Sequence, residues 1–156
     1  MRQEQIELIV YDFDGVMTDN KVIVFENGIE AVIANRGDGL GIGMLKDLGI
    51  LQIILSTETN DVVAARAKKL KLESIYGCKN KKTKLLEYCK DKNIDLNNVL
   101  YVGNDINDLE AMEAVGFSVA PADSHKEILK FADFVTNAEG GQGVIRELAD
   151  FIIDEN

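Results

Sequence analysis

LIVYDFDGVMTD, residues 8–19, is the stretch that decides the fold of this chain. It opens on an apolar run that indicates a buried strand over residues 6–12, and two carboxylates follow where the strand ends. Asp12 and Asp14 are two residues apart, so an extended backbone points both to one face, and Gly15 lets the chain turn away. Carboxylates held this close repel each other unless a cation lies between them, and such oxygen ligands suit Mg²⁺. An aspartate can also act as a nucleophile in phosphoryl transfer, whereas two solvated acids are the plainer interpretation.

Composition limits the class of protein. The 156 residues favour one domain spanning 1–156, with 46% hydrophobic and 28% charged residues, as in ordinary globular chains. A net charge of −10 argues against nucleic-acid binding, and an anionic substrate would have to meet local positive charge. Two cysteines, Cys78 and Cys89, do not make a disulfide framework. We therefore expect a cytoplasmic protein with no signal peptide and no membrane span.

Strand and helix patterns alternate along the chain. Further strands are expected at 52–55, 74–76, 98–102, 117–119 and 134–135, and helices at 38–48, 61–70, 81–91, 108–115, 124–131 and 144–153. This alternation predicts an α/β fold, a Rossmann-like doubly wound parallel sheet between two helical layers. Ligands of such folds bind at the carboxyl ends of the strands, so functional groups are expected just after each strand.

A β-hairpin interrupts the connection that follows the first strand. Residues 21–25 and 30–34 are rich in β-branched residues and flank Asn27-Gly28, a strong hairpin signal, so an insertion at about 20–35 is expected to project from the sheet. Its apolar side chains need burial, which indicates a contact with another subunit.

Polar groups follow two other predicted strands. Ser56 and Thr57 form a hydroxyl pair suited to phosphate oxygens, although they could equally cap the next helix. Asn104, Asp105 and Asp108 offer further oxygen ligands to a cation, or a capping pair for the helix behind them.

Four lysines gather at the start of one predicted helix, at positions 79, 81, 82 and 84. Lysine is unfavourable at a helix start, so one of them could serve an anion, while a solvated face is the plainer interpretation. All these groups fall at one edge of one sheet. Together they predict Mg²⁺-assisted phosphoryl transfer to an aspartate.

These segments resemble the motifs of a known family. DFDGV at 12–16, Ser56, a following lysine and GNDIND at 103–108 are similar, in order and spacing, to the four motifs of haloacid dehalogenase superfamily phosphatases. The short chain, the hairpin and the missing cap insertion resemble the capless subfamily, which includes phosphatases of 3-deoxy-D-manno-octulosonate 8-phosphate and of nonulosonate 9-phosphates. NRGDGLGI at 35–42 and GGQGVIRE at 140–147 also resemble signatures of that subgroup.

The resemblance implies a role for each motif residue. Asp12 would be the nucleophile and, with the backbone carbonyl of Asp14, a ligand of Mg²⁺. The Asp14 side chain would be the general acid and base. Ser56 would hold the phosphoryl group, and Lys81, with Lys82 as the alternative, would be the family lysine.

The resemblance also implies further ligands and partners. The third metal ligand is Asn104 or Asp105, a choice the motif leaves open because the family usually has aspartate directly after the glycine. Relatives of this kind are typically homotetramers in which a neighbouring subunit closes the site. That arrangement would place Arg146 near a substrate carboxylate. A residue on the surface of its helix is the equal alternative for Arg146. The implied substrate contacts are Asn35, Arg36, Gly37, Asp38, Gly39, Thr57, Glu58, Lys69, Asn107, Asp108 and Arg146.

One departure bears on the substrate. Octulosonate phosphatases usually have glycine and arginine after the motif-two hydroxyl, where this chain has Thr57 and Glu58. Lys69 could pair with Glu58 and so favour a neutral hydroxyl or an amine of a longer sugar acid. We therefore expect a phosphatase of 2-keto-3-deoxy-nonulosonate (KDN) or N-acylneuraminate 9-phosphate, with the octulosonate 8-phosphate as the alternative.

Two other classes are weighed against this interpretation. A phospho-receiver domain also has early acids, a hydroxyl and a lysine, but its phosphorylated aspartate follows a middle strand, where this chain has Ser56. A non-catalytic assembly domain is disfavoured because Asp12 and Asp14 are both present.

Overall fold

A single parallel sheet organises the computed structural model, which describes residues 5–154. The strands follow the order β5-β4-β1-β6-β7-β8, so β1 lies in the middle. Their bounds are β1 Leu8–Tyr11, β4 Leu51–Leu55, β5 Glu73–Ile75, β6 Val99–Val102, β7 Phe117–Ala120 and β8 Phe134–Val135. In register, Tyr11 pairs with Ile54 on one side and with Val102 on the other, so these three strands end at one level. The predicted doubly wound α/β fold is confirmed.

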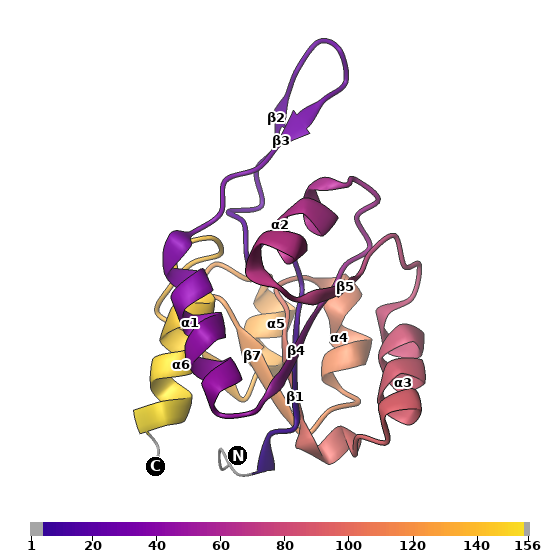
Figure 1. Cartoon of the computed structure of the whole chain (residues 1–156), viewed down its shortest axis with the longest axis vertical. Coiled ribbons are helices and arrows are strands. Elements are labelled where there is room, and N and C mark those ends of the chain that lie inside the picture. The colour runs from indigo at the N-terminus through magenta and orange to yellow at the C-terminus, as the bar shows by residue number, and fades with distance from the viewer. Residues whose placement is uncertain (1–4, 155–156) are drawn as a thin grey trace.

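Helices cover both faces of the sheet (Figure 1). One core contains residues of α1 Arg36–Asp47, α2 Val62–Leu70 and α6 Val144–Asp154, and the other contains residues of α3 Lys81–Lys92, α4 Ile106–Met112 and α5 Lys126–Phe131. A short 3₁₀ turn, Leu96–Asn98, precedes β6. Because successive side chains of a strand point to opposite faces, Ile9 joins the first core and Val10 the second. None of the helices within the described residues is long and apolar enough to cross a membrane.

Helices α1 and α6 pack closely because glycine stands at their contact. A Cβ added at Gly41 would lie 2.7 Å from the carbonyl oxygen of Ile145, so a larger residue would push the helices apart. The N-cap of α1 is Asn35, whose side chain accepts a hydrogen bond from the backbone N–H of Gly37. The predicted start of this helix at residue 38 is therefore two residues late, since α1 already begins at Arg36.

Helix α4 also begins earlier than predicted. Asp105 is its N-cap, and Asp108 completes a capping box three residues later, so the helix starts at Ile106 rather than at 108.

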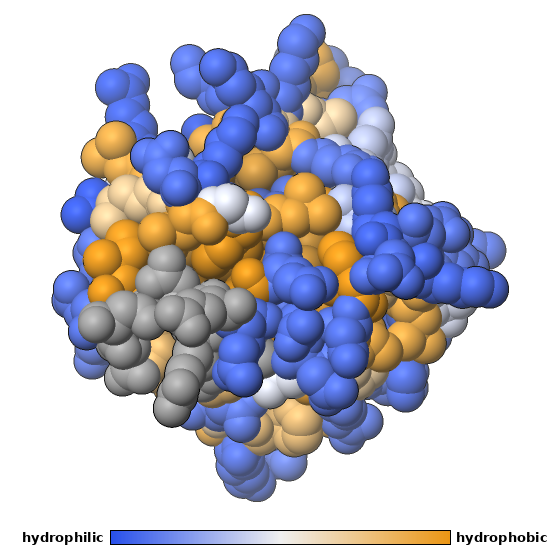
Figure 2. All heavy atoms as spheres, turned by 60° about the horizontal axis from the view of Figure 1, so that its bottom comes forward, coloured by the Kyte–Doolittle hydropathy of each residue, from blue (hydrophilic) through white to orange (hydrophobic). Residues whose placement is uncertain are grey.

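The hairpin projects beyond the carboxyl ends of the sheet strands (Figure 1). Its ladder, β2 Ile23–Val24 against β3 Glu30–Ala31, is shorter than expected. Several of its apolar side chains are at least half exposed: Val22, Ile23, Val24, Phe25, Ile29 and Ile33. At the opposite end of the molecule, apolar side chains lie in the middle of the surface and hydrophilic ones surround them (Figure 2).

Candidate active site

A buried lysine links two buried aspartates at the carboxyl end of the sheet. Asp12 follows β1, and its backbone N–H donates to the carbonyl of Val102 on β6. The Nζ of Lys81, the first residue of α3, lies 2.8 Å from Asp12 Oδ1 and 2.7 Å from Asp108 Oδ1. The three side chains are almost inaccessible to solvent. Such a cluster is stable only if its charges compensate one another, so the ammonium fixes the position of Asp12.

The cluster perturbs its own ionisation. Burial, followed by the charge of Asp108, raises the pKa of Asp12, while Lys81 opposes this rise. Burial lowers the pKa of Lys81, but the charges of Asp12 and Asp108 outweigh burial and raise it overall. Lys81 therefore stays protonated at neutral pH. A divalent cation beside Asp12 would favour its carboxylate form.

Three oxygen atoms converge beside this cluster. Asn104 Oδ1 lies 2.9 Å from the backbone carbonyl oxygen of Asp14 and 3.2 Å from Asp12 Oδ2. Rotating the Asn104 amide would let its N–H groups donate to both oxygens, which is the arrangement expected without a cation. With its oxygen inward, the spacing matches the edge of about 3 Å between neighbouring ligands of an octahedral Mg²⁺ with bonds of about 2.1 Å. The donor set therefore fits a hard divalent cation.

The ligand set is unusual in containing a single carboxylate. Within residues 5–154 no three His, Cys, Asp or Glu side chains form a metal-binding group. A cation would take one carboxylate oxygen from Asp12, the amide oxygen of Asn104 and the carbonyl oxygen of Asp14. Gly15 makes this approach possible: its φ is +83°, and a Cβ there would overlap the Asn104 amide.

The side chain of Asp14 lies between two pockets. The first, of about 90 Å³, is the catalytic pocket, lined by Asp12, Asp14, Asn20, Ser56, Thr57, Asn104, Asp105 and Asn107. Asp14 and Asn20 also line a neighbouring pocket of about 260 Å³ under the hairpin. Burial, followed by the charge of Glu58, raises the pKa of Asp14. A carboxyl with a raised pKa at the junction of two pockets is placed to protonate a leaving group.

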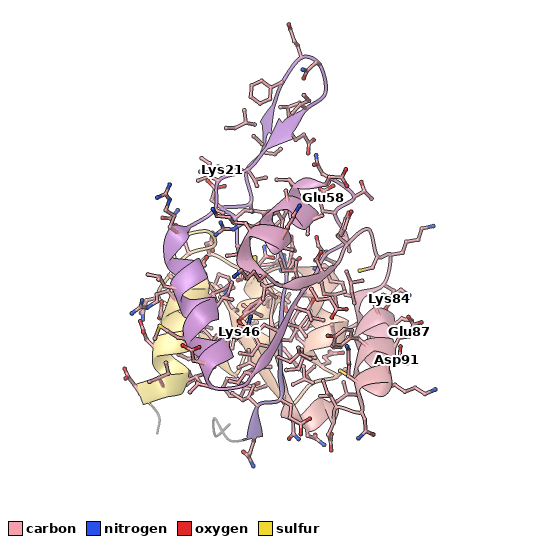
Figure 3. The ribbon with its side chains drawn as sticks, viewed as in Figure 1. Lys21, Lys46, Glu58, Lys84, Glu87 and Asp91 are labelled. Carbon is pink, nitrogen blue, oxygen red and sulfur yellow. The ribbon has the colours of Figure 1, made fainter. Side chains whose placement is uncertain are left out.

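The charged residues of the neighbouring pocket are mostly acidic. Besides Asp14, it contains Glu30 and Glu58, with Lys21 as its basic residue. Figure 3 shows Lys21 at the base of the hairpin and Glu58 near the start of α2. Asn60 Nδ2 donates to Glu30, which ties the hairpin to the loop before α2. Carboxylates and amides in such a pocket can accept and donate hydrogen bonds to sugar hydroxyls.

Ser56 is held at the floor of the catalytic pocket. It follows β4, is buried, and its Oγ accepts from the backbone N–H of Glu58. Its hydroxyl proton is thus left for an acceptor oxygen. Thr57 lines both the catalytic pocket and a small pocket beside Lys81.

The positions of the side chains distinguish between residues that the motifs left as alternatives. Lys81 reaches Asp12, whereas Lys82 is partly exposed. The Asn104 amide faces the other two oxygens, whereas Asp105 is exposed and its Oδ1 accepts from the N–H of Ile106. Asp108 is fully buried and does not line the catalytic pocket.

Other predicted substrate contacts lie away from this pocket in the single chain. The carboxylate of Asp38 is buried against the N-terminus of α6, where it accepts from the backbone N–H groups of Ile145 and Arg146, so its role here is structural. The Nε of Arg146 lies 3.0 Å from Asp150 Oδ2 on its own helix.

A separate basic pocket contains three of the remaining predicted contacts. Arg36, Gly39 and Lys69 line it with Ala34, Arg66, Leu70 and Lys71. Asn35 adjoins this pocket, since its carbonyl accepts from Arg66 Nη2. Gly37 donates to the Asn35 side chain that caps α1.

The expected pair of Glu58 and Lys69 is not formed within residues 5–154. Glu58 Oε1 instead accepts from the backbone N–H groups of Thr59 and Asn60. Lys69 lies in the basic pocket, which shares no lining residue with the pocket of Glu58.

Sequence reasoning missed Asn20, Lys21, Glu30 and Asn60, which line the pockets beside Asp14. The hairpin brings three of them to the site. No motif points to these residues, and a helix start such as Asn60 is ordinarily read as a cap.

Comparisons with known proteins identify the family of this chain. The sequence profile of haloacid dehalogenase-like hydrolases matches residues 45–148. The KdsC 3-deoxy-D-manno-octulosonate 8-phosphate phosphatase of Salmonella typhi is 35% identical over 97% of this chain and 81% of its own length. A HAD family hydrolase from Streptomyces avermitilis has a TM-score of 0.95 at 45% identity, covering 98% of this chain and 88% of that one.

A third comparison bears on ligands. The octulosonate 8-phosphate phosphatase of Moraxella catarrhalis, solved with a magnesium ion, a phosphate ion and a KDO molecule, has a TM-score of 0.93 at 31% identity. The match covers 97% of this chain and 88% of that chain. This chain belongs to the haloacid dehalogenase-like hydrolases. Within them it is a phosphoric monoester hydrolase, as the motifs predicted.

Proposed function

We propose that this protein is an Mg²⁺-dependent phosphatase of a 3-deoxy-2-ulosonic acid phosphate that acts through an aspartyl-phosphate. The observation that carries the proposal is the position of Asp12. One of its oxygens is held by Lys81, and the other faces the oxygens of Asn104 and Asp14. A carboxylate fixed in this way combines a nucleophile with a ligand for a cation.

The residues divide the reaction between them. Asp12 attacks phosphorus and forms a P–O bond while the bond from phosphorus to the sugar oxygen breaks. Asp14 gives its proton to the leaving sugar oxygen and then, as a carboxylate, takes a proton from the water that attacks the aspartyl-phosphate. Phosphate leaves and Asp12 is restored. Lys81 and the Ser56 hydroxyl bind the oxygens of the transferred group, and a bound Mg²⁺ would supply positive charge to them.

The substrate that we propose is the octulosonate 8-phosphate, which the sequence motifs left as the alternative to a nine-carbon substrate. The curated relative and the Moraxella structure are named for that substrate. The nine-carbon preference depended on a pair of Glu58 with Lys69, and the two side chains lie in different pockets. The preference for KDN or N-acylneuraminate 9-phosphate is therefore not supported.

A kinetic comparison tests the substrate. Purified protein with Mg²⁺ should release phosphate from the octulosonate 8-phosphate with a higher kcat/KM than from either nonulosonate 9-phosphate. Higher kcat/KM on a nine-carbon substrate would refute the choice of substrate while leaving the phosphatase chemistry intact.

Replacement of the nucleophile tests the chemistry. Asp12→Asn should abolish Mg²⁺-dependent phosphate release, because an amide cannot form the aspartyl-phosphate. Asp95→Asn, at an exposed cap near the opposite ends of the strands, is the matched control and should keep wild-type rates. Turnover that survives in Asp12→Asn would rule out the aspartyl-phosphate.

We also propose that the chain assembles as a homotetramer through its hairpin. The exposed apolar residues of the hairpin form a surface that a second copy of the chain would bury, and Val24 is 64% exposed. Sedimentation velocity should show a tetramer for the wild type and smaller species for Val24→Lys. The control Leu86→Lys, at an exposed apolar residue of α3, should stay tetrameric. A wild-type monomer would refute the assembly. The cytoplasmic location remains a prediction, in keeping with the free state of Cys78 and Cys89.

A further inference from the structure

A buried tyrosine extends the cluster of Lys81. The hydroxyl of Tyr101, on β6, donates to Asp108 Oδ1 over 2.9 Å. The ammonium of Lys81 donates to the same oxygen and to Asp12 Oδ1. Tyr101 and Asp108 have no exposed surface, so these hydrogen bonds do not compete with water. A continuous chain of contacts therefore runs from the Tyr101 hydroxyl to the nucleophile.

Each oxygen of Asp108 has two donors among residues 5–154. Oδ1 accepts from Tyr101 and Lys81, and Oδ2 accepts from the backbone N–H groups of Asn104 and Asp105. The two backbone donors fix the carboxylate relative to the loop that carries the Asn104 amide. Of these two donors on Oδ1, the Tyr101 hydroxyl is the one that does not also contact Asp12.

This arrangement matters because one ammonium is shared by two carboxylates. Donation from Tyr101 neutralises part of the charge on Asp108 Oδ1 and so weakens its attraction for Lys81. Without the hydroxyl, Oδ1 would have Lys81 as its remaining donor, and the ammonium would move toward Asp108 and away from Asp12. The nucleophile and the phosphoryl group would then lose part of their electrostatic support.

We propose that Tyr101 is a positioning residue of the phosphatase reaction, whose hydroxyl sets the place of the Lys81 ammonium between Asp108 and Asp12. The proposal rests on the proposed function. It adds to that function a residue that contacts neither substrate nor metal. Burial of a tyrosine does not by itself create this role: Tyr11, on the neighbouring strand, is equally buried and donates to Gln52 in the other core.

The test compares two tyrosine-to-phenylalanine variants. Tyr101→Phe removes the hydroxyl and keeps the ring in the core. Tyr88→Phe is the matched control, because Tyr88 is on α3 with Lys81, packs in the same core, and loses a hydrogen bond to Glu73 instead. Tyr101→Phe should lower kcat roughly tenfold to a hundredfold, as expected for one hydrogen bond to a charged group, with KM unchanged. Tyr88→Phe should keep the kcat of the wild type.

A spectroscopic readout separates positioning from general destabilisation. In ¹⁵N spectra of lysine ammonium groups, the Lys81 signal should shift in Tyr101→Phe and stay in place in Tyr88→Phe. The wild type offers a second spectroscopic readout. The Lys81 ammonium protons should show a nuclear Overhauser contact with the Tyr101 hydroxyl proton. This contact needs no variant, so the proposal can be tested even if Tyr101→Phe does not fold.

The outcomes are distinct. Equal kcat in the two variants, an unshifted Lys81 signal, or no Overhauser contact in the wild type would overturn the positioning role. Rates are measured on the sugar phosphate and on p-nitrophenyl phosphate. If the wild type hydrolyses no sugar-acid phosphate, the proposed function is refuted. The role of Tyr101 is then still tested by the rates on p-nitrophenyl phosphate and by the spectra.

Discussion

Replacing Asp38 by asparagine should remove a pH-dependent loss of stability. The carboxylate of Asp38 is 1% exposed and connects α1 to α6. Its Oδ2 is buried without a hydrogen-bond partner in the described part of the chain. Burial raises the pKa of Asp38 from 3.8 to about 6, and the N–H groups of Arg146 and Ile145 and the charge of Arg66 oppose that rise only in part.

The direction and the size of the change in stability with pH follow from the pKa of Asp38. The folded protein binds the Asp38 proton more tightly than the unfolded chain, so the stabilisation is fully present below pH 3.8 and is lost as the pH rises through about 6. A pKa rise from 3.8 to about 6 corresponds to a loss of about 3 kcal/mol at neutral pH. About 2 kcal/mol of that loss falls between about pH 4.5 and 7.5.

The assay is urea unfolding between pH 4.5 and 7.5 at one protein concentration, because assembly also contributes to stability. The free energy of unfolding of Asp38→Asn, relative to the wild type, should rise by about 2 kcal/mol across this range. Any cost of the new amide that is the same at every pH does not affect this rise. Asp47→Asn, an exposed change at the other end of α1, should show no such trend. A difference between Asp38→Asn and wild type that is flat or falls with pH would refute the argument.

Four further changes test the packing and the cation site. Gly41→Ala should lower the free energy of unfolding by roughly 1–3 kcal/mol in urea, because its Cβ would press on Ile145, whereas Gly43→Ala, with open space at its Cβ, should raise it by up to about 1 kcal/mol. Gly15→Ala should abolish Mg²⁺ binding in isothermal titration calorimetry, since its Cβ would displace the Asn104 amide. Asn104→Asp should bind Mg²⁺ more tightly by the same method, because a second carboxylate adds charge to the ligand set. Equal affinity in Asn104→Asp and wild type would place the ion elsewhere.

Much of the fold and site could be predicted because the relevant signals are local. Each apolar run ends at a polar residue, and parallel strands bring their carboxyl ends to one edge, which is why Asp12, Ser56 and Asn104 meet in one pocket. The predicted strands and helices agree with the observed ones to within about two residues at most ends.

The remaining errors concern contacts between distant segments. Asn35 and Asp38 are both good caps, and what distinguishes them is α6, more than a hundred residues away. Lys81 and Lys82 have the same local sequence environment, and their burial differs because neighbouring residues of a helix point in different directions. Asp108 was taken for a ligand because the sequence does not show that Lys81 and Tyr101 occupy its Oδ1.

The amide at residue 104 changes the charge that a phosphoryl group would meet. Counted at their formal charges, Asp12, Asp108 and Lys81 sum to one negative charge, and a divalent cation would turn this into one positive charge. An aspartate at 104 would cancel that charge. Asn104 therefore leaves the site cationic toward a phosphate dianion in a chain whose net charge is −10. On this reasoning Asn104→Asp should bind Mg²⁺ more tightly and yet transfer phosphate more slowly, a combination that simple loss of a ligand would not produce.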